Sequence, residues 1–184
     1  MYLNMLICLF PQRVFFFPLK PKLKSLLSTK KYWEMCQHEF QRPRNGNFMT
    51  DVYDGSAWQE FMGPCNYPND RLGFVMCIDG IPAFSAGTKS LIPWVWGNWS
   101  LPPTHRVQLK YMLLYMLLDD SIKYEAQRKY YDFAIDYELK ELHDEGVDGV
   151  RVKVFTAPMD TKGKEEMAGI FWYDAVYFDM MRQL

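Results

Sequence analysis

An apolar run that ends in one acid, RLGFVMCID over residues 71–79, limits the possible fold more than any other feature. Its near-continuous apolar character predicts a buried strand, which Gly80 and Pro82 end. A second strand is predicted over residues 89–99, which are aromatic and β-branched. Residues 107–118 are apolar on all sides, so periodicity allows a helix or a strand. We favour a third strand here from its context.

A helix and a further strand follow these segments. An apolar stripe predicts an amphipathic helix over residues 125–145, and Gly146 is a typical helix stop. Residues 150–155, VRVKVF, alternate valine with basic residues, which predicts a strand with one buried face. A last helix is predicted from about Thr161. The predicted fold class is α/β, with mixed α and β elements: three antiparallel strands, a helix, a parallel strand and a helix.

This order of elements resembles a ribonuclease H-like core, in which the first and fourth strands lie side by side and parallel. The first strand ends in Asp79 and the fourth leads to Asp160, so we expect the two carboxylates to meet. Phosphodiester cleavage commonly uses two Mg²⁺ ions about 3.5–4 Å apart, and Mg²⁺ prefers carboxylate oxygen. Asp79 and Asp160 are therefore candidate catalytic residues and ligands of Mg²⁺ or Mn²⁺. The alternative is an ordinary turn or cap role, which is common for an aspartate at a strand end.

The charge of the chain is uneven. Residues 13–44 carry eight Lys/Arg and two acids, whereas the remainder has an excess of acids. A basic arm of this kind can contact phosphates, although a solvated helix face explains the charges equally well. Leu23, Leu26 and Leu27 predict a short amphipathic helix that runs to about Phe40, packs its leucines on the body and leaves its lysines in solvent. The candidate DNA-binding residues are Lys20, Lys22, Lys24, Lys30, Lys31, Arg42 and Arg44.

Other classes of protein are poorly supported. The longest apolar stretch is too short to span a bilayer, so no membrane partner is expected. The four cysteines lack zinc-ribbon spacing, and Cys36 with His38 provides only two ligands, so no zinc site is expected. The predicted organisation is a basic N-terminal segment with a helical lead-in over residues 1–70, then a truncated ribonuclease H-like core over residues 71–184.

Seven segments between about residues 14 and 170 resemble, in order, the transposases of CACTA (En/Spm-type) elements. The match to Asp-x-x-Pro-x-Phe at Asp79 carries the first catalytic aspartate of that family. Departures occur at Asn98, which is displaced from its Leu-Pro-Pro, at His143, where tryptophan is usual, and after Asp160, where Pro-Ala is usual. The segments are FFFPLKPKLKSLL, KKYWEMCQHEF, DVYDGSAWQEF, RLGFVMCIDGIPAF, WGNWSLPPTHR, YELKELHDEGV and APMDTKGKEEMAGI.

The resemblance implies a nuclear DNA transposase that cuts and joins DNA at transposon ends with three acids and Mg²⁺ or Mn²⁺. Only Asp79 and Asp160 carry over, and the third acid is expected past Leu184, so we expect a fragment that is inactive alone and possibly self-associating. Two alternatives stay open: a domesticated module that binds DNA or a protein without catalysis, and a non-functional remnant of a decaying element.

Overall fold

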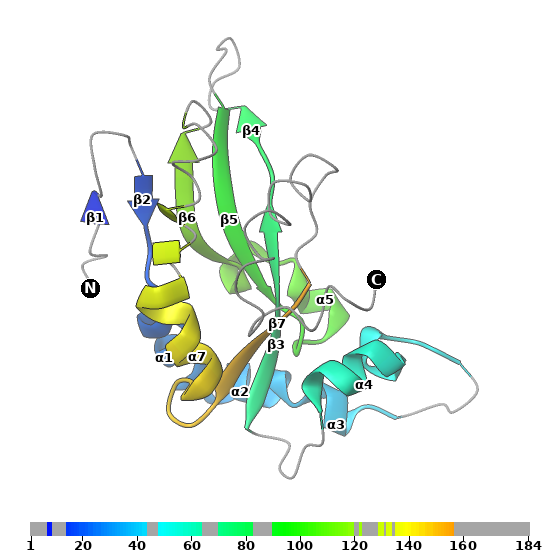
Figure 1. Ribbon diagram of the computed structural model, residues 1–184. Helices are drawn as coiled ribbons and strands as arrows, with labels where there is room; N and C mark the ends of the chain where they lie inside the picture. Colours follow the sequence, from blue (N-terminus) through cyan, green and yellow to red (C-terminus); the bar gives the residue numbers. More distant parts are fainter. Residues whose placement is uncertain are drawn as a thin grey trace.

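One mixed sheet organises the chain. The structure is a computed structural model that describes residues 7–8, 14–43, 48–63, 70–82, 90–119, 122, 129–130, 132–133 and 135–156. The strand order is β1-β2-β6-β5-β3-β7, and β4 pairs with β5 beside this path (Figure 1). The strands are β1 (Ile7–Cys8), β2 (Val14–Phe16), β3 (Arg71–Ile78), β4 (Ile81–Pro82), β5 (Ser90–Asn98), β6 (Leu113–Asp119) and β7 (Arg151–Thr156).

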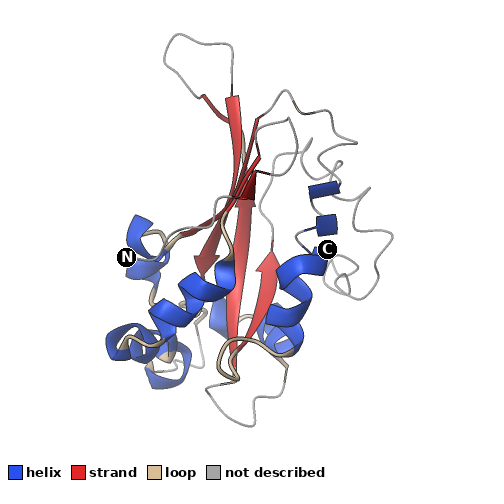
Figure 2. Ribbon diagram, turned by 90° about the vertical axis from the view of Figure 1, so that its left-hand side faces the viewer, coloured by secondary structure: helices blue, strands red, loops and turns tan. Residues whose placement is uncertain are grey.

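Short helices connect the strands and lie on both sides of the sheet when it is viewed from the side (Figure 2). The predicted mixed α/β class is therefore confirmed. The α-helices are α1 (Leu19–Leu27), α2 (Lys30–Cys36), α3 (His38–Gln41), α4 (Ser56–Met62), α5 (Pro103–Arg106) and α7 (Lys140–Asp144). Two 3-10 helices, η1 (Val52–Asp54) and η2 (Leu109–Tyr111), and one π-helical turn, η3 (Ile135–Leu139), complete the described elements.

The central strand β3 has one antiparallel and one parallel neighbour. It pairs antiparallel with β5 and parallel with β7, so the predicted side-by-side placement of the first and fourth strands is confirmed. Because β5 is also antiparallel to β6, β6 runs in the same direction as β3. β3 begins at the end of the sheet where the helices gather and runs away from them (Figure 1).

A β-bulge explains why the third strand has no clear period. The predicted segment 107–118 begins with η2, and the strand itself starts only at Leu113. The register with β5 shifts between Trp94, which pairs with Met116, and Val95, which pairs with Leu114. The extra residue, Tyr115, reverses the alternation, so that neighbouring residues 115 and 116 are both buried. A strict two-residue period could not identify this strand.

The N-terminal segment is built into the sheet. β2 pairs with β6, and the single helix predicted from Pro21 to about Phe40 is instead three helices, with a break at residues 28–29. Leu19 and Leu23 are buried in the same core as Leu72 and Phe74, and Leu26 and Leu27 pack against it, which confirms the predicted leucine contact. One hydrophobic core therefore runs across the boundary that was predicted at residue 70.

The opposite face of β3 receives α4. A Cβ atom on Gly73 would lie 2.3 Å from Cη2 of Trp58, so the indole rests directly on the backbone of the strand. Trp58 is fully buried with Tyr53 and Met62 in a second, smaller cluster. The glycine is required here because any side chain would occupy the place of the indole.

The predicted helix 125–145 is described only in part. Tyr130 and Leu142 lie in the core, and α7 ends before Gly146, whose φ of +76° fits the predicted stop. The helix predicted from Thr161 lies outside the described residues. In the described part of the chain, no helix is long and apolar enough to cross a membrane.

Candidate metal and nucleic-acid site

Asp79 follows the last residue of β3 and is exposed at the end of the sheet away from the helices. The strand is buried from Leu72 to Met76, so its apolar residues anchor the backbone that presents this carboxylate. Among the residues that the structure describes, no group of three His, Cys, Asp or Glu side chains is placed to hold a metal ion. Asp79 therefore offers one oxygen ligand of the type that Mg²⁺ prefers.

The second candidate, Asp160, lies outside the described residues, but the strand that leads to it is described. In the parallel pairing of β3 with β7, Val75 is the partner of Thr156. Asp79 is four residues beyond Val75, and Asp160 is four residues beyond Thr156. The pairing thus gives the two aspartates equal counts from a common paired position.

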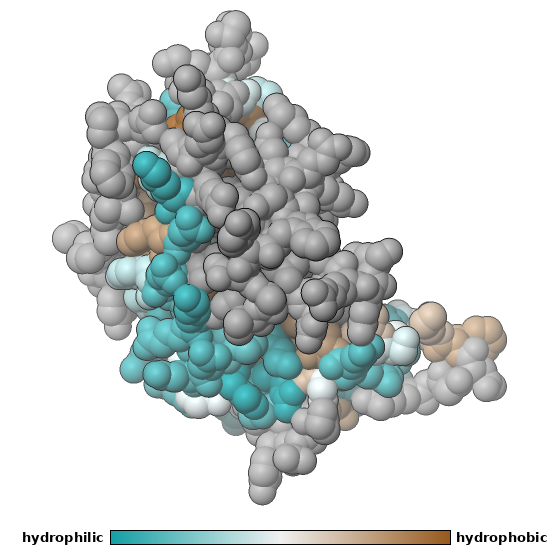
Figure 3. All heavy atoms as spheres, in the orientation of Figure 1, coloured by the Kyte–Doolittle hydropathy of each residue, from teal (hydrophilic) through white to brown (hydrophobic). Residues whose placement is uncertain are grey.

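Most of the candidate DNA-binding lysines have partners within the chain. Lys20 pairs with Glu141, Lys24 Nζ lies 3.6 Å from Asp148, and Lys30 Nζ lies 3.8 Å from Glu34. Hydrophilic residues accordingly cover the face formed by α1 and α7 (Figure 3). Lys31 is exposed. The positive charge of α1 is therefore partly balanced by acids of the following body.

Lys22 differs from the other lysines of α1. Its Nζ donates to the carbonyl of Leu114 at 2.6 Å and lies 4.9 Å from the ring centre of Phe17. Burial lowers the pKa of this ammonium group. The prediction that Lys22 stands in solvent is therefore wrong, because its stem covers the start of β6.

The basic helices and Asp79 belong to opposite ends of the sheet. Lys22 of α1 contacts the first residues of β6, and β6 runs parallel to β3, so α1 lies at the end where β3 begins. The eight residues of β3 span roughly 26 Å at about 3.3 Å per residue. The lysines of α1 and α2 and Asp79 cannot contact the same phosphate group.

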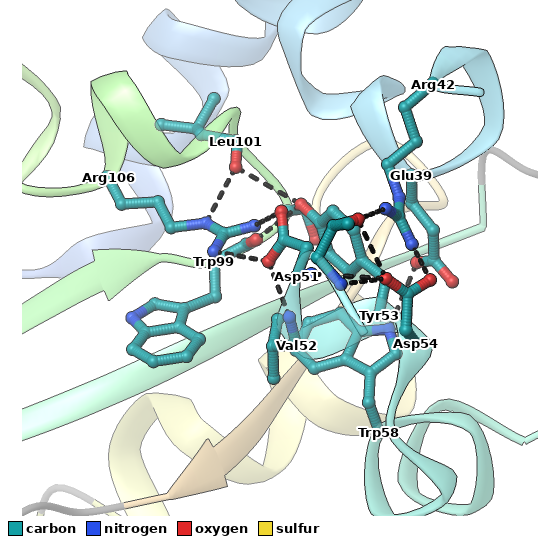
Figure 4. A network of polar contacts seen from close by, with 12 residues as sticks. Glu39, Arg42, Asp51, Val52, Tyr53, Asp54, Trp58, Trp99, Leu101 and Arg106 are labelled. Atoms are coloured by element: carbon teal, nitrogen blue, oxygen red, sulfur yellow. Dashed lines mark hydrogen bonds and ion pairs between the residues drawn. The ribbon is translucent and has the colours of Figure 1, made fainter. Parts of the chain in front are cut away.

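A nearly buried ion pair joins the segment before the sheet to the loop after β5 (Figure 4). Arg106 donates from Nη1 and Nη2 to the two carboxylate oxygens of Asp51 at 2.7 and 2.8 Å, and from Nε to the carbonyl of Leu101 at 2.8 Å. The side chains are 10% and 5% exposed. A bidentate pair with little water around it holds both segments in one geometry.

A second ion pair closes the other side of this network. Arg42 pairs with Asp54 and donates to Oγ1 of Thr50 at 2.9 Å, and its side chain is 7% exposed. The bond from Arg42 is the main reason that the pKa of Asp54 is far below its ordinary value, and backbone N–H donors add to it. Arg42, a predicted DNA contact, is therefore engaged inside the protein. Arg44 lies outside the described residues.

Tyr53 lies between the two arginines. Cζ of Arg42 is 5.4 Å and Cζ of Arg106 is 5.0 Å from the centre of its ring, and its hydroxyl donates to the carbonyl of Trp99 at 2.6 Å. Burial raises the pKa of this hydroxyl, so it remains a donor at neutral pH. The segment DVYDG is thus a joint between the helices and the sheet, which is a structural role and not a direct catalytic one.

The segment WGNWS also has a structural role. Asn98 is fully buried, donates to the hydroxyl of Tyr32 at 2.9 Å, and accepts from the backbone N–H of Ser100 at 2.9 Å. Its amide also lies 3.3 Å from Sγ of Cys36. Burial raises the pKa of the Cys36 thiol to about 12, so the sulfur stays protonated at neutral pH.

Sequence reasoning missed Glu138. The π-helical turn η3 turns this carboxylate into the protein, where it is 3% exposed and accepts from the backbone N–H groups of Leu19 and Lys20 at 2.8 and 2.6 Å. Those are the first two helical residues of α1, and the third, Pro21, has no N–H. The cap lies more than a hundred residues away in sequence, so no local capping signal could reveal it.

We expect Glu138→Ala to lower the free energy of unfolding by about 1–3 kcal/mol, because two buried N–H groups lose their acceptor. Burial raises the pKa of Glu138, and the bonds from Leu19 and Lys20 oppose this. A carboxyl group with a raised folded pKa contributes stability below its unfolded pKa, about 4.3, and that contribution is lost as the pH rises through the folded pKa.

The pH dependence is tested by urea unfolding of wild type and Glu138→Gln between about pH 4 and pH 7. Glutamine stands in for the protonated acid, so the stability of wild type relative to this variant should fall as the pH rises. The exposed Asp136→Asn is the control and should show no comparable trend. A wild type that gains stability relative to Glu138→Gln with rising pH would mean that the capping bonds outweigh burial.

Comparisons of the chain with family models, with curated proteins and with solved structures gave no match.

Proposed function

We propose that this chain carries the first two acidic residues of the catalytic centre of a CACTA-type DNA transposase, built on a ribonuclease H-like core. The observation that carries the proposal is the parallel pairing of β3 with β7. Asp79 and Asp160 are the same number of residues beyond one pair of that ladder, so a continued register brings their carboxylates to one end of the sheet. The ordered resemblance of seven segments supports the same family.

In this proposal Asp79 bridges two metal ions and Asp160 is a further ligand. The exposed carboxylate of Asp79 at the end of a rigid, buried strand fits this role. Bound Mg²⁺ would supply an activated water and stabilise the leaving oxygen of a phosphodiester. The residues of the chain itself hold the carboxylates in place and present them to DNA from the open end of the sheet.

The proposed substrate is duplex DNA at transposon ends, and the proposed place of action is the nucleus. Lys24, Lys30 and Lys31 are the exposed members of the candidate DNA-binding set. They lie at the end of the sheet opposite Asp79, so in this proposal they bind DNA away from the cleaved bond. Contacts of this type are sequence-independent and weaken steeply with salt.

The proposal predicts that Asp79→Asn and Asp160→Asn each weaken Mn²⁺ binding about tenfold or more, because each removes a charged oxygen ligand. The measurement is a titration of the 184-residue chain followed by the electron paramagnetic resonance of free Mn²⁺. Asp136→Asn, an exposed acid on η3, is the matched control and should bind like wild type.

The same variants distinguish the proposed enzyme lineage from a module without catalysis. Unchanged Mn²⁺ binding in both variants, together with DNA binding in EDTA, would favour the binding module. The chain alone is expected not to cleave DNA at a useful rate, since two carboxylates do not preorganise a metal pair. Cleavage of duplex or branched DNA that both substitutions abolish would contradict that expectation and require a third ligand within these residues.

A further inference from the structure

The two parallel strands that lead to Asp79 and Asp160 are joined at their first residues by a polar clasp, which we define as Asp70, Arg71, Arg151 and Lys153. Arg151 donates from Nη2 to Oδ2 of Asp70 at 2.7 Å, and its backbone N–H donates to the carbonyl of Asp70 at 2.8 Å. Arg71 donates from Nε to Oδ1 of the same carboxylate at 2.8 Å. One carboxylate therefore binds a guanidinium from the start of each strand.

The C-terminus of α4 provides the second part of the clasp. Arg71 donates to the carbonyl of Met62, and Lys153 donates from Nζ to the carbonyl of Phe61 at 2.8 Å. Cations suit this position because the last carbonyls of a helix lack partners within the helix. Lys153 also lies 5.4 Å from the ring centre of Phe61. α4 thus contacts β3 and β7 at the same time.

These contacts determine which residues of the two strands face one another. Arg71 is paired with Arg151 and Gly73 with Lys153, so the clasp holds the first three levels of the ladder. Hydrophobic burial selects the face of a strand, but a slip by two residues keeps the same face toward the core. Polar contacts from specific residues of β7 exclude such a slip, since it would move both cations away from their acceptors.

We infer that Arg151 and Lys153 are positioning residues for the proposed metal site. This inference rests on the proposed function. By setting the register of β7 against β3, they bring Asp160 level with Asp79 from the far end of the strands, without contact with metal or DNA. The alternation of valine and base in VRVKVF thus has two purposes: the valines at 152 and 154 pack on the core, and the bases fix the register.

The test is the affinity of the full chain for Mn²⁺, with amide hydrogen exchange of β7 as a second readout. The double variant Arg151→Met/Lys153→Met keeps the apolar stems and removes the charges. It should bind Mn²⁺ about tenfold more weakly, in line with losses at residues that orient metal ligands, and exchange the β7 amides faster. Arg151→Lys/Lys153→Arg retains both cations and should recover most of the affinity. Lys140→Met, from an exposed pair on α7, is the charge-matched control and should stay within about twofold of wild type.

The possible results separate the clasp from the site itself. If Asp79→Asn weakens Mn²⁺ binding and the double methionine variant does not, the clasp inference is overturned and the proposed function stands. If Asp79→Asn also binds like wild type, the metal site is wrong and the clasp has no role in it. Should the double variant fail to fold, Lys153→Met alone leaves the Asp70–Arg151 pair in place and is judged by the same two readouts.

Discussion

Arg106→Met is expected to lower the free energy of unfolding by about 3–5 kcal/mol, because removing one partner of a buried ion pair leaves the other charge uncompensated. Asp51 is 5% exposed and would keep its charge with little water near it. The carbonyl of Leu101 would also lose a donor, and the ring of Tyr53 would lose a guanidinium on one side. Urea unfolding of wild type and variant measures the difference.

Two controls identify the cause of this loss. Lys140→Met removes a cation from an exposed pair and should cost at most about 0.5 kcal/mol. The double variant Asp51→Asn/Arg106→Met removes the stranded charge but keeps an oxygen for the N–H of Val52, so it should be more stable than Arg106→Met alone. If Arg106→Met costs no more than Lys140→Met, the ion pair does not hold the N-terminal helices to the sheet.

The second large effect is expected at Gly73. A single added methyl group would meet the six-membered ring of Trp58, with contacts of 2.3, 2.9 and 3.2 Å to three of its atoms. The indole is fully buried and cannot move aside freely. Gly73→Ala should therefore destabilise the protein by about 1–3 kcal/mol through overpacking.

A double-mutant cycle tests whether the indole is the cause. Trp58→Phe removes the ring atoms that the new methyl group would meet, at the cost of a cavity and of the bond from Trp58 Nε1 to Glu39. In the Trp58→Phe background, Gly73→Ala should cost clearly less than in wild type, or nothing. Equal costs in the two backgrounds would show that α4 does not rest on this strand as described.

The fold could be predicted from the sequence where local pattern and burial agree. The continuous apolar run of β3, the valine alternation of β7 and the glycine stop at Gly146 each predict their element, and the parallel neighbours β3 and β7 follow from the order of the elements. The start of β6 could not be predicted, because its bulge places Tyr115 and Met116 on the same buried side.

The contacts around the candidate site could not be predicted, since they join residues far apart in the sequence. Glu138 caps a helix that begins more than a hundred residues earlier, and Arg106 pairs with Asp51 across 55 positions. The charge count of the basic arm was informative about composition but not about availability. Lys22 and Arg42 are satisfied within the protein, and only the three-dimensional arrangement reveals this.

The central claim is that Asp79 and Asp160 share one metal site at the ends of β3 and β7. Its most direct test is a crystal structure of the 184-residue chain soaked with Mn²⁺, with the anomalous signal of the metal used to locate it. The account predicts a peak within about 2–2.5 Å of a carboxylate oxygen of both Asp79 and Asp160. A structure that places the two aspartates on opposite faces of the sheet, or a peak that contacts neither, would contradict it.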